Sequence, residues 1–402
     1  MALPPSPHTG ESPPIRNMRI TFWGVQGSCT VSPSRQDVEA YARRIATATL
    51  ERALRDIAAR LENGDCTADS LRALSTPHAL NAYHRQLGLP SLPAFDGDTT
   101  CIEVQTSEGN TLLFDMGSGL RAFSRHALAN WPQDKPRTLH VFASHEHLDH
   151  RNGVPLASLF FDRATPFTFH VHGTRRALAA LDDRYGLFSR DPSTVSHYDD
   201  PIDFRNVSAT FIGTEIRTAS EASAQLGTQL PWSIRDVSDP IRIGQTIITP
   251  FEVYHARTQC LAFHVRHGSA TFLYCTDHEL RHGDDPADAR QVRSMEAEER
   301  VLAHCQNADV GYFDGQYFLE EYRGLKGIGS GVPVSRMDWG HGCIEDVIDR
   351  SRRCHVRQTY IGHHDPERPW EERFKIDNDL RSISPGIHSR IELAKAGMVI
   401  DV

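Results

Sequence analysis

The sequence predicts an α/β protein built from two β-sheets with helices on their outer faces. Short apolar segments of strand length recur along the chain, and helical patterns alternate with them in its second half. A chain of 402 residues with 39% hydrophobic and 24% charged content can bury a full core. Its apolar runs are too short to cross a membrane, which takes roughly 18–20 residues.

The N-terminal segment and the cysteines indicate a cytoplasmic protein with one domain. Residues 1–17 are rich in Pro and Ser and contain no apolar segment, so we expect a flexible tail rather than a secretion signal. Residues 18–402 then form the single domain. The eight cysteines are scattered and include no CxxC pair, which favours reduced thiols over a disulfide framework.

The first strand, expected at 18–23, is followed by a helical insertion at about 34–90. Ser34 and Asp37 form a capping-box pattern, and Asn63-Gly64 ends the first helix. A second helical segment is expected at 69–87. Because the insertion contains no cluster of catalytic residue types, we expect it to form a lid or a dimer contact. The first helix keeps helical spacing of the apolar residues Val38, Tyr41, Ile45, Leu54, Ile57 and Leu61.

From residue 98 onward the pattern changes to short strands. A hairpin is expected at 101–106 and 111–115, and an apolar strand at 138–144. The stretch 182–242 is weakly patterned, and we expect an irregular excursion there. Further strands are expected at 167–171, 208–212, 245–253, 260–266, 270–276, 310–313 and 358–361, with helices at 292–304 and 344–352.

A dense group of metal-binding residue types follows the apolar strand at 138–144. The segment reads His145-Glu146-His147-Leu148-Asp149-His150. His145 and His147 can converge on one ion where the chain leaves the sheet, while Asp149 and His150 project one step further, toward a second ion. Imidazole and carboxylate ligands at this density suit Zn²⁺, Mn²⁺ or Fe²⁺. The 22 histidines of the chain agree with metal binding or acid–base chemistry.

This segment resembles the HxHxDH signature of the metallo-β-lactamase superfamily. The resemblance extends along most of the chain and implies a four-layer αββα sandwich with its site at one edge of the sheets. It also implies two divalent metal ions, with Zn²⁺ first and Mn²⁺ or Fe²⁺ as alternatives, and support for the metal loop from Asp115. The implied ligands are His145, His147 and His255 for one ion, Asp149, His150 and His363 for the other, and Asp277 as the bridge.

Three further segments look like one branch of that superfamily, which contains phosphodiesterases of cyclic nucleotides and of phosphoribosyl cyclic phosphates and is related to ribonuclease Z. The resemblance implies that His341, oriented by Asp314, protonates the leaving oxygen. His364 is a second candidate acid or phosphate contact, and Asp149 is expected to be catalytic as well as a ligand. The segments are Phe313-Asp314-Gly315-Gln316-Tyr317 with Glu320-Glu321-Tyr322, Trp339-Gly340-His341, and Gly362-His363-His364-Asp365-Pro366.

The chain departs from this branch at two places that border the substrate. Ala256-Arg257-Thr258-Gln259-Cys260 stands where relatives usually have a Gly-rich stretch. Gly342-Cys343 stands where they usually have Ser-Thr. The substrate can therefore differ from those of the relatives.

The leading hypothesis is hydrolysis of a P–O bond in a small cyclic nucleotide or related cyclic phosphate, and the resemblance implies a homodimer. A ribonuclease Z-like endonuclease is a weaker alternative, because only 22 positions separate His255 from Asp277 and leave no room for a tRNA-binding arm. The net charge of −9 also disfavours a large nucleic acid partner. A lactamase or thioesterase activity, and a binding module that has lost its metal, stay open as alternatives.

Overall fold

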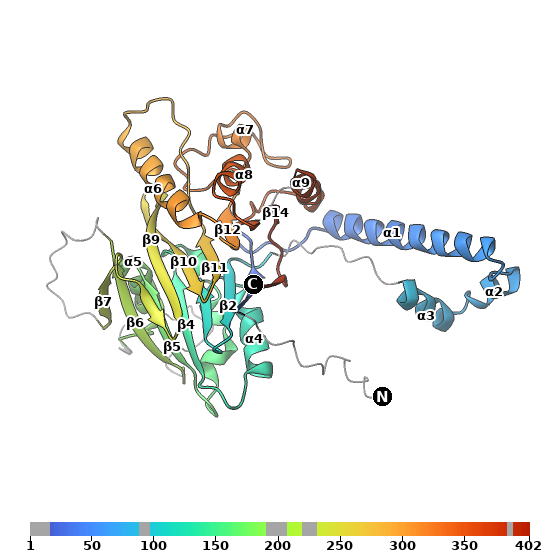
Figure 1. Ribbon diagram of the computed structural model, residues 1–402, viewed down its shortest axis with the longest axis horizontal. Coiled ribbons are helices and arrows are strands. Elements are labelled where there is room, and N and C mark those ends of the chain that lie inside the picture. The colour runs from blue at the N-terminus through green and yellow to red at the C-terminus, as the bar shows by residue number, and fades with distance from the viewer. Residues whose placement is uncertain (1–16, 88–96, 190–206, 219–230, 384–388) are drawn as a thin grey trace.

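The computed structural model describes residues 17–87, 97–189, 207–218, 231–383 and 389–402 (Figure 1). The predicted N-terminal tail, apart from its last residue, and the end of the predicted insertion at 88–90 lie outside these ranges. Two parts of the predicted excursion, 190–206 and 219–230, lie outside them as well. In the described part of the chain, no helix has the length and the apolar character that a membrane span requires.

Two β-sheets form the centre of the molecule. Within the described ranges, the first sheet has eight strands in the spatial order β15 (Val399–Asp401), β1 (Met18–Gly24), β2 (Cys101–Thr106), β3 (Thr111–Phe114), β4 (Thr138–Ala143), β5 (Thr168–Gly173), β6 (Thr210–Arg217) and β7 (Ser233–Asp236). The second has seven, in the order β14 (Arg390–Leu393), β13 (Gln358–Gly362), β12 (Val310–Asp314), β11 (Ala270–Cys275), β10 (Thr258–His267), β9 (Thr246–His255) and β8 (Ile241–Ile243).

Helices cover the outer face of each sheet, so the molecule has the four layers αββα (Figure 1). One apolar cluster lies between the sheets, a second joins the first sheet to α4 and α5, and a third joins the second sheet to α6, α8 and α9. This confirms the predicted fold class. The helices are α4 (Leu120–Asn130), α5 (Arg175–Tyr185), α6 (Ala289–Cys305), α8 (Ile344–Arg353) and α9 (Trp370–Ser382), with a short α7 (Leu319–Tyr322).

The position of a strand between two apolar layers explains its composition. In β3 all four residues of the segment TLLF are buried. Leu112 and Phe114 point into the cluster between the sheets, whereas Leu113 points into the cluster beneath α4. Successive side chains of a strand face opposite sides, so a strand covered on both faces is apolar throughout instead of alternating.

The predicted insertion forms a helical arm that extends away from the sheets (Figure 1). It consists of α1 (Arg35–Glu62), α2 (Ala68–Ala73) and α3 (Pro77–Leu87). The predicted capping box is present, because the Ser34 hydroxyl accepts from the Asp37 N–H and the Asp37 carboxylate accepts from the Ser34 N–H.

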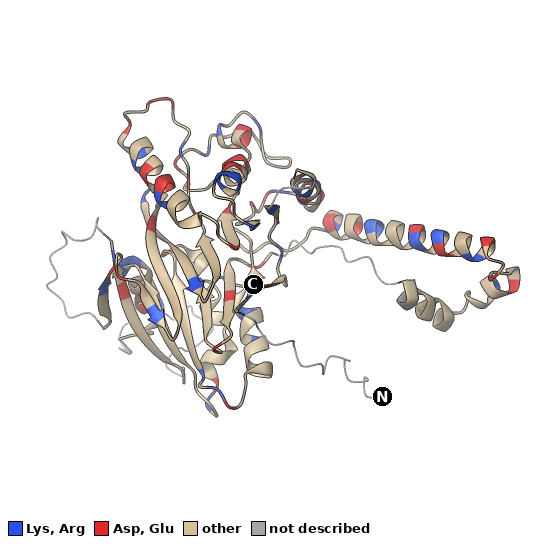
Figure 2. Ribbon diagram, viewed as in Figure 1, with Lys and Arg blue, Asp and Glu red and all other residues tan. Residues whose placement is uncertain are grey.

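The apolar residues of α1 are not covered as their spacing suggests. Val38 is 53% and Leu54 is 66% exposed, and acidic and basic residues occur along much of the helix (Figure 2). The base of the arm is held by Tyr41, whose ring meets Trp370 of α9 edge to face at 5.6 Å. Both roles considered for the arm, a lid and a dimer contact, therefore stay predictions.

The stretch 182–242 is more regular than its weak patterning predicts. Its described parts contain β6, β7 and β8, and β6 pairs in parallel with both β5 and β7. The helices α4, α5 and α9 were also not expected. Their apolar faces are short, and packing against the sheets rather than helical propensity stabilises them.

A buried ion pair joins two helices on the outer face of the second sheet. Arg350 of α8 donates to both carboxylate oxygens of Glu298 in α6, at 3.0 and 2.6 Å, and His278 contacts the same carboxylate at 2.9 Å. Burial opposes ionisation of Glu298, but the guanidinium of Arg350 and its hydrogen bonds lower the pKa of this carboxyl.

We expect Arg350→Met to destabilise the fold by about 3–5 kcal/mol at neutral pH, because it leaves the Glu298 carboxylate buried without its partner. The loss should shrink as the pH falls, since Glu298 can then become protonated in the variant. Chemical denaturation at several pH values measures the effect. Arg353→Met, an exposed position of the same helix paired with Asp349, should change little. Equal stability of the two variants would refute the assignment.

Candidate metal centre

The predicted ligands lie at the carboxyl ends of strands. The segment 145–150 follows β4, His255 is the last residue of β9, Asp277 follows β11, and His363 follows β13. Because β10 lies between β9 and β11 and is antiparallel to both, the ends of β9 and β11 lie at the same edge of the sheet. The sheet topology therefore brings together residues that are far apart in the sequence.

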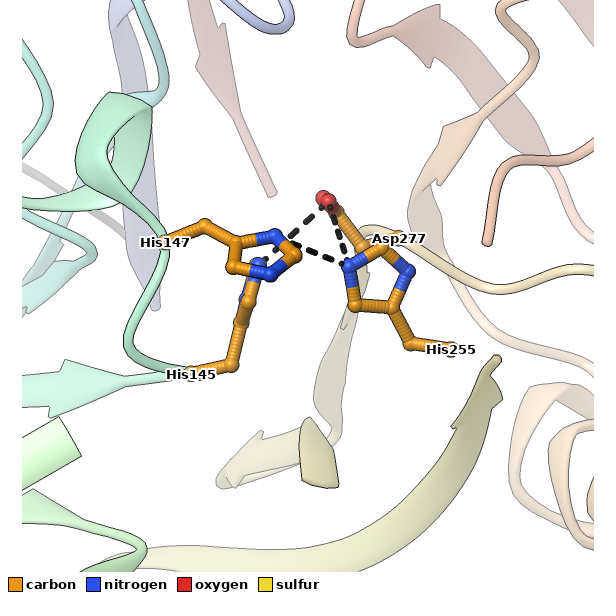
Figure 3. A group of neighbouring side chains, drawn as sticks. All are labelled: His145, His147, His255 and Asp277. Carbon is orange, nitrogen blue, oxygen red and sulfur yellow. Dashed lines mark hydrogen bonds and ion pairs between the residues drawn. The ribbon is translucent and has the colours of Figure 1, made fainter. Parts of the chain in front are cut away.

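The first ligand group consists of His145, His147, His255 and Asp277, with one ligand atom of each within 4.8 Å of the others. Figure 3 shows the three imidazoles and the carboxylate facing one another. His145 Nε2 and His255 Nε2 lie 3.5 and 3.6 Å from Asp277 Oδ2. His147 Nδ1 lies 3.1 Å from His255 Nε2. These separations are similar to those between ligands that share one ion at about 2.0–2.2 Å.

The second ligand group consists of Asp149, His150 and His363. His363 Nε2 lies 3.2 Å from Asp149 Oδ2 and 3.3 Å from Asp277 Oδ1. His150 Nε2 lies 3.2 Å from the same oxygen of Asp277. Asp277 thus presents Oδ2 to the first group and Oδ1 to the second, which is the arrangement of a bridging carboxylate.

Hydrogen bonds on the far side of the rings fix their orientation. Asp115 Oδ2 lies 2.7 Å from His150 Nδ1, and Asp115 Oδ1 accepts from the Ser144 N–H at 2.7 Å. The Gly340 carbonyl lies 2.7 Å from His255 Nδ1. A proton held on Nδ1 in this way leaves Nε2 free to bind a metal. The structure therefore places Asp115 behind the metal loop, as the resemblance implies.

The residues present fit a pair of divalent ions. His145 Nε2 and His150 Nε2 are buried and form no hydrogen bond within the described part of the chain. A buried polar atom without a partner costs roughly 1–3 kcal/mol, which an ion between the ligands would remove. Both groups contain only imidazole and carboxylate donors, which suit Zn²⁺, Mn²⁺ or Fe²⁺.

The charge state of the groups also suits a cation. Burial opposes ionisation of Asp277, but His363, His150 and His145 keep the pKa of its carboxyl well below the usual range. Burial lowers the pKa of His255 to about 3, so this imidazole is neutral at physiological pH. Metal binding needs the deprotonated form of both residue types, which Asp277 and His255 already have. Burial opposes protonation of His150, but Asp277, Asp149 and Asp115 raise the pKa of this imidazole, so a metal would displace its proton.

The backbone around the groups requires glycine at two positions. Gly340 has a φ of +93°, and a Cβ there would lie 1.9 Å from His255 Nδ1. A Cβ at Gly27 would lie 2.3 Å from His363 Nδ1. Asp277 and His363 have φ values of 47° and 54°, a conformation that residues with a Cβ rarely adopt. Such strain persists only where the surrounding structure enforces it, as it commonly does at functional sites.

His341 and Asp314, which we call the acid pair, lie beside both groups. His341 Nδ1 is 2.9 Å from Asp314 Oδ2 and 3.8 Å from Asp277 Oδ2. The ring of His341 stacks on that of His363 with centroids 4.7 Å apart. Burial opposes protonation, but Asp314 and its hydrogen bond, with Asp277 and Asp149, raise the pKa of His341 to about 9. His341 thus holds a proton next to the ligand groups.

The structure does not bring His364 to the centre, which corrects its assignment as a second acid. The side chain is buried, and its Nε2 lies 2.8 Å from the carbonyl oxygen of Ala394. Burial lowers the pKa of His364 to about 3, so the ring is neutral. His363 turns toward the ligands and His364 turns away, although the two residues are adjacent in the sequence.

Sequence reasoning missed a carboxylate that holds the acid loop. Glu279 accepts hydrogen bonds from the N–H groups of Asp338 and Gly340, both at 2.8 Å, and from the hydroxyl of Tyr322. It thereby fixes the segment just before His341. Its place two residues after Asp277 is the one signal in the sequence that could have drawn attention to it.

The comparisons with known proteins concern the fold. No protein-family model and no curated protein matches the sequence. Zn²⁺-bound PqqB from Methylobacterium extorquens is similar in structure, with 12% identity, a TM-score of 0.51 and coverage of 96% of this chain and 100% of that chain.

Two other solved structures are more distant. The metallo-β-lactamase fold protein YhfI from Bacillus subtilis has 12% identity and a TM-score of 0.47 over 96% of this chain and 99% of that chain. The short form of human tRNase Z has the same identity and TM-score over 95% and 98%. The four layers, the ligand groups at the strand ends and the similarity to PqqB together show that this chain has the metallo-β-lactamase fold.

Proposed function

We propose that the chain is a metal-dependent hydrolase that cleaves phosphodiester bonds. The acid pair carries this proposal. His341 Nδ1 is bound to Asp314 at 2.9 Å, while its Nε2 forms no hydrogen bond within the described ranges. Cleavage of a P–O bond expels an alkoxide, a strong base that needs a proton as it leaves. A thioester expels a thiolate, a much weaker base, so an acid pair of this kind favours phosphorus chemistry over thioester hydrolysis.

The metal ligands and the acid pair have different roles in the proposed hydrolysis. When bound, two divalent ions supply a nucleophile from water at neutral pH and neutralise charge on the phosphoryl oxygens. Asp277 holds the two ligand groups at a fixed separation, and Asp149 completes the second group. Asp314 orients His341 with its Nδ1–H toward the carboxylate, which leaves the proton on Nε2 for the leaving oxygen.

A small cyclic nucleotide or related cyclic phosphate is the substrate class that we propose. The interval between His255 and Asp277 is filled by β10 and β11, so it contains no arm for gripping a long RNA. Trp339, two positions before His341, is 53% exposed and offers a flat apolar surface to a base. Zn²⁺ as the native metal, a homodimeric assembly and a cytoplasmic location belong to the same proposal.

A substrate panel tests the proposal. The protein is stripped with a chelator, reloaded with Zn²⁺ or Mn²⁺, and given bis-p-nitrophenyl phosphate, cyclic mono- and dinucleotides and 2′,3′-cyclic phosphates. We expect diester cleavage that depends on the added metal and is strongest for one cyclic substrate, read by product chromatography. Turnover of nitrocefin or a thioester without diester cleavage would overturn the proposal. Tight, salt-sensitive tRNA binding would favour the ribonuclease Z-like alternative.

A further inference from the structure

A second kind of ligand cluster lies outside the two ligand groups. It consists of His282, Cys343 and Asp346, with one ligand atom of each within 4.8 Å of the others. His282 belongs to the segment between β11 and α6, whereas Cys343 and Asp346 belong to the start of α8. His282 Nε2 lies 2.9 Å from Asp346 Oδ2. We call these residues the thiol cluster.

The thiol of Cys343 has no role in capping the helix that it precedes. Cys343 occupies the N-cap position of α8, but its side chain makes no capping hydrogen bond. It is 1% exposed, and its backbone neighbours are held by Tyr317, whose carbonyl accepts from the Ile344 N–H at 2.8 Å. The backbone that carries the sulfur is therefore held, and the sulfur lies next to an imidazole and a carboxylate.

The charges around Cys343 favour a cation. Burial raises the pKa of its thiol, and the carboxylates of Asp346, Glu345, Asp314 and Glu279 raise it further. A divalent ion would offset these negative charges. It would also displace the thiol proton to the solvent as the metal–sulfur bond forms, which is how cysteine usually binds metals.

We propose that His282, Cys343 and Asp346 bind a third divalent ion of the Zn²⁺ class, separate from the dinuclear centre. One thiolate and one carboxylate balance the two charges of the ion, and the imidazole completes three protein ligands. The Zn–S bond of about 2.3 Å and Zn–N and Zn–O bonds of about 2.0–2.2 Å require ligand atoms roughly 3.3–3.7 Å apart. The three ligand atoms lie within 4.8 Å of one another, and an ion between them would replace the direct contact of 2.9 Å between His282 and Asp346.

The ion has a route to the site from solvent. The side chains of His282 and Asp346 are 22% and 13% exposed, whereas Cys343 lies beneath them. Three protein ligands leave one position for water. A bound ion would connect the segment that follows Asp277 to the segment that follows His341. It would therefore stabilise the loops that carry these two residues.

Cobalt spectroscopy separates this site from the dinuclear centre. Both ligand groups of that centre contain only nitrogen and oxygen donors, so a thiolate-to-Co²⁺ charge-transfer band in the near ultraviolet reports on a sulfur ligand alone. The stripped protein is titrated with Co²⁺ while metal content and absorption are measured. We expect three bound equivalents and a charge-transfer band that Cys343→Ser abolishes together with one equivalent.

The matched control is Cys29→Ser. Cys29 is an exposed thiol close to Asp149, so it is an accessible competing sulfur, whereas Cys260, whose sulfur lies 3.8 Å from His145 Nδ1, is fully buried. We expect this variant to keep the band. His282→Ala should weaken the third equivalent and leave the other two. No band at any loading, a band that persists in Cys343→Ser, or a band lost in Cys29→Ser would overturn the proposal. None of these measurements depends on hydrolytic activity. Failure of the phosphodiesterase proposal can therefore be distinguished from failure of the proposal for a third ion.

Discussion

Asp277→Asn is expected to lower the metal content to fewer than two ions at the dinuclear centre and to reduce turnover to the level of the metal-free protein. Asp277 is the residue whose two carboxylate oxygens face different ligand groups, at 3.5 Å from His145 Nε2 and 3.3 Å from His363 Nε2. Asparagine has similar size and tolerates the positive φ of 47° at this position, but it lacks the negative charge. Metal analysis and diester turnover measure the outcome.

The control for this change is a strand-end carboxylate of β7, the edge strand of the first sheet. Asp236 ends β7 and accepts from the Ser238 N–H at 2.9 Å. Asp236→Asn should keep the metal content and the activity. If Asp277→Asn retained both ions and full turnover, the bridging arrangement would be wrong, and with it the assignment of the two groups.

His341→Ala is expected to keep both ions of the dinuclear centre and to lower kcat by about 10²–10⁴-fold with little change in KM. The reason is that His341 donates a proton during bond cleavage rather than holding substrate. The loss should therefore depend on the leaving group. It should be large for a cyclic nucleotide, which expels an alkoxide, and small for bis-p-nitrophenyl phosphate, whose leaving group is stable as an anion.

The dependence on the leaving group shows whether His341 acts as a general acid or as a metal ligand. Loss of metal in His341→Ala, with equal damage to both substrates, would show that the residue is a ligand. His364→Gln provides the matched control, because His364 is buried against Ala394 and turned away from the ligands. We expect that variant to affect stability without changing the ratio between the two substrates.

Features that depend on a few adjacent residues could be predicted from the sequence. The apolar strand before His145, the dense cluster that follows it and the capping box at Ser34 are each read from a few adjacent residues, and the structure has all of them. The two-sheet class could also be predicted, because β3, β4 and β11 are apolar over strand length.

Features that depend on neighbours in space could not be predicted. The side chain of His364 has the same chemistry as that of His363, and only the direction in which each leaves β13 decides which one reaches the ligands. Glu279 acts through backbone groups about 60 positions away, which no local pattern encodes. The apolar spacing of α1 predicted a covered face, but the arm extends away from the surface that could have covered it.

The sequence by itself determined the dense cluster at 145–150, the apolar strand before it and the helical identity of the insertion, because each follows from backbone periodicity and side-chain chemistry over short distances. His255, Asp277 and His363 followed only from the resemblance to a known superfamily. Only the tertiary structure decided which of these residues meet. It placed Asp277 between two groups, set His341 against Asp314, turned His364 into the core and gathered His282, Cys343 and Asp346 at the start of α8. The physical reason is that convergence depends on strand order and on the packing of the two sheets, which are properties of the whole chain.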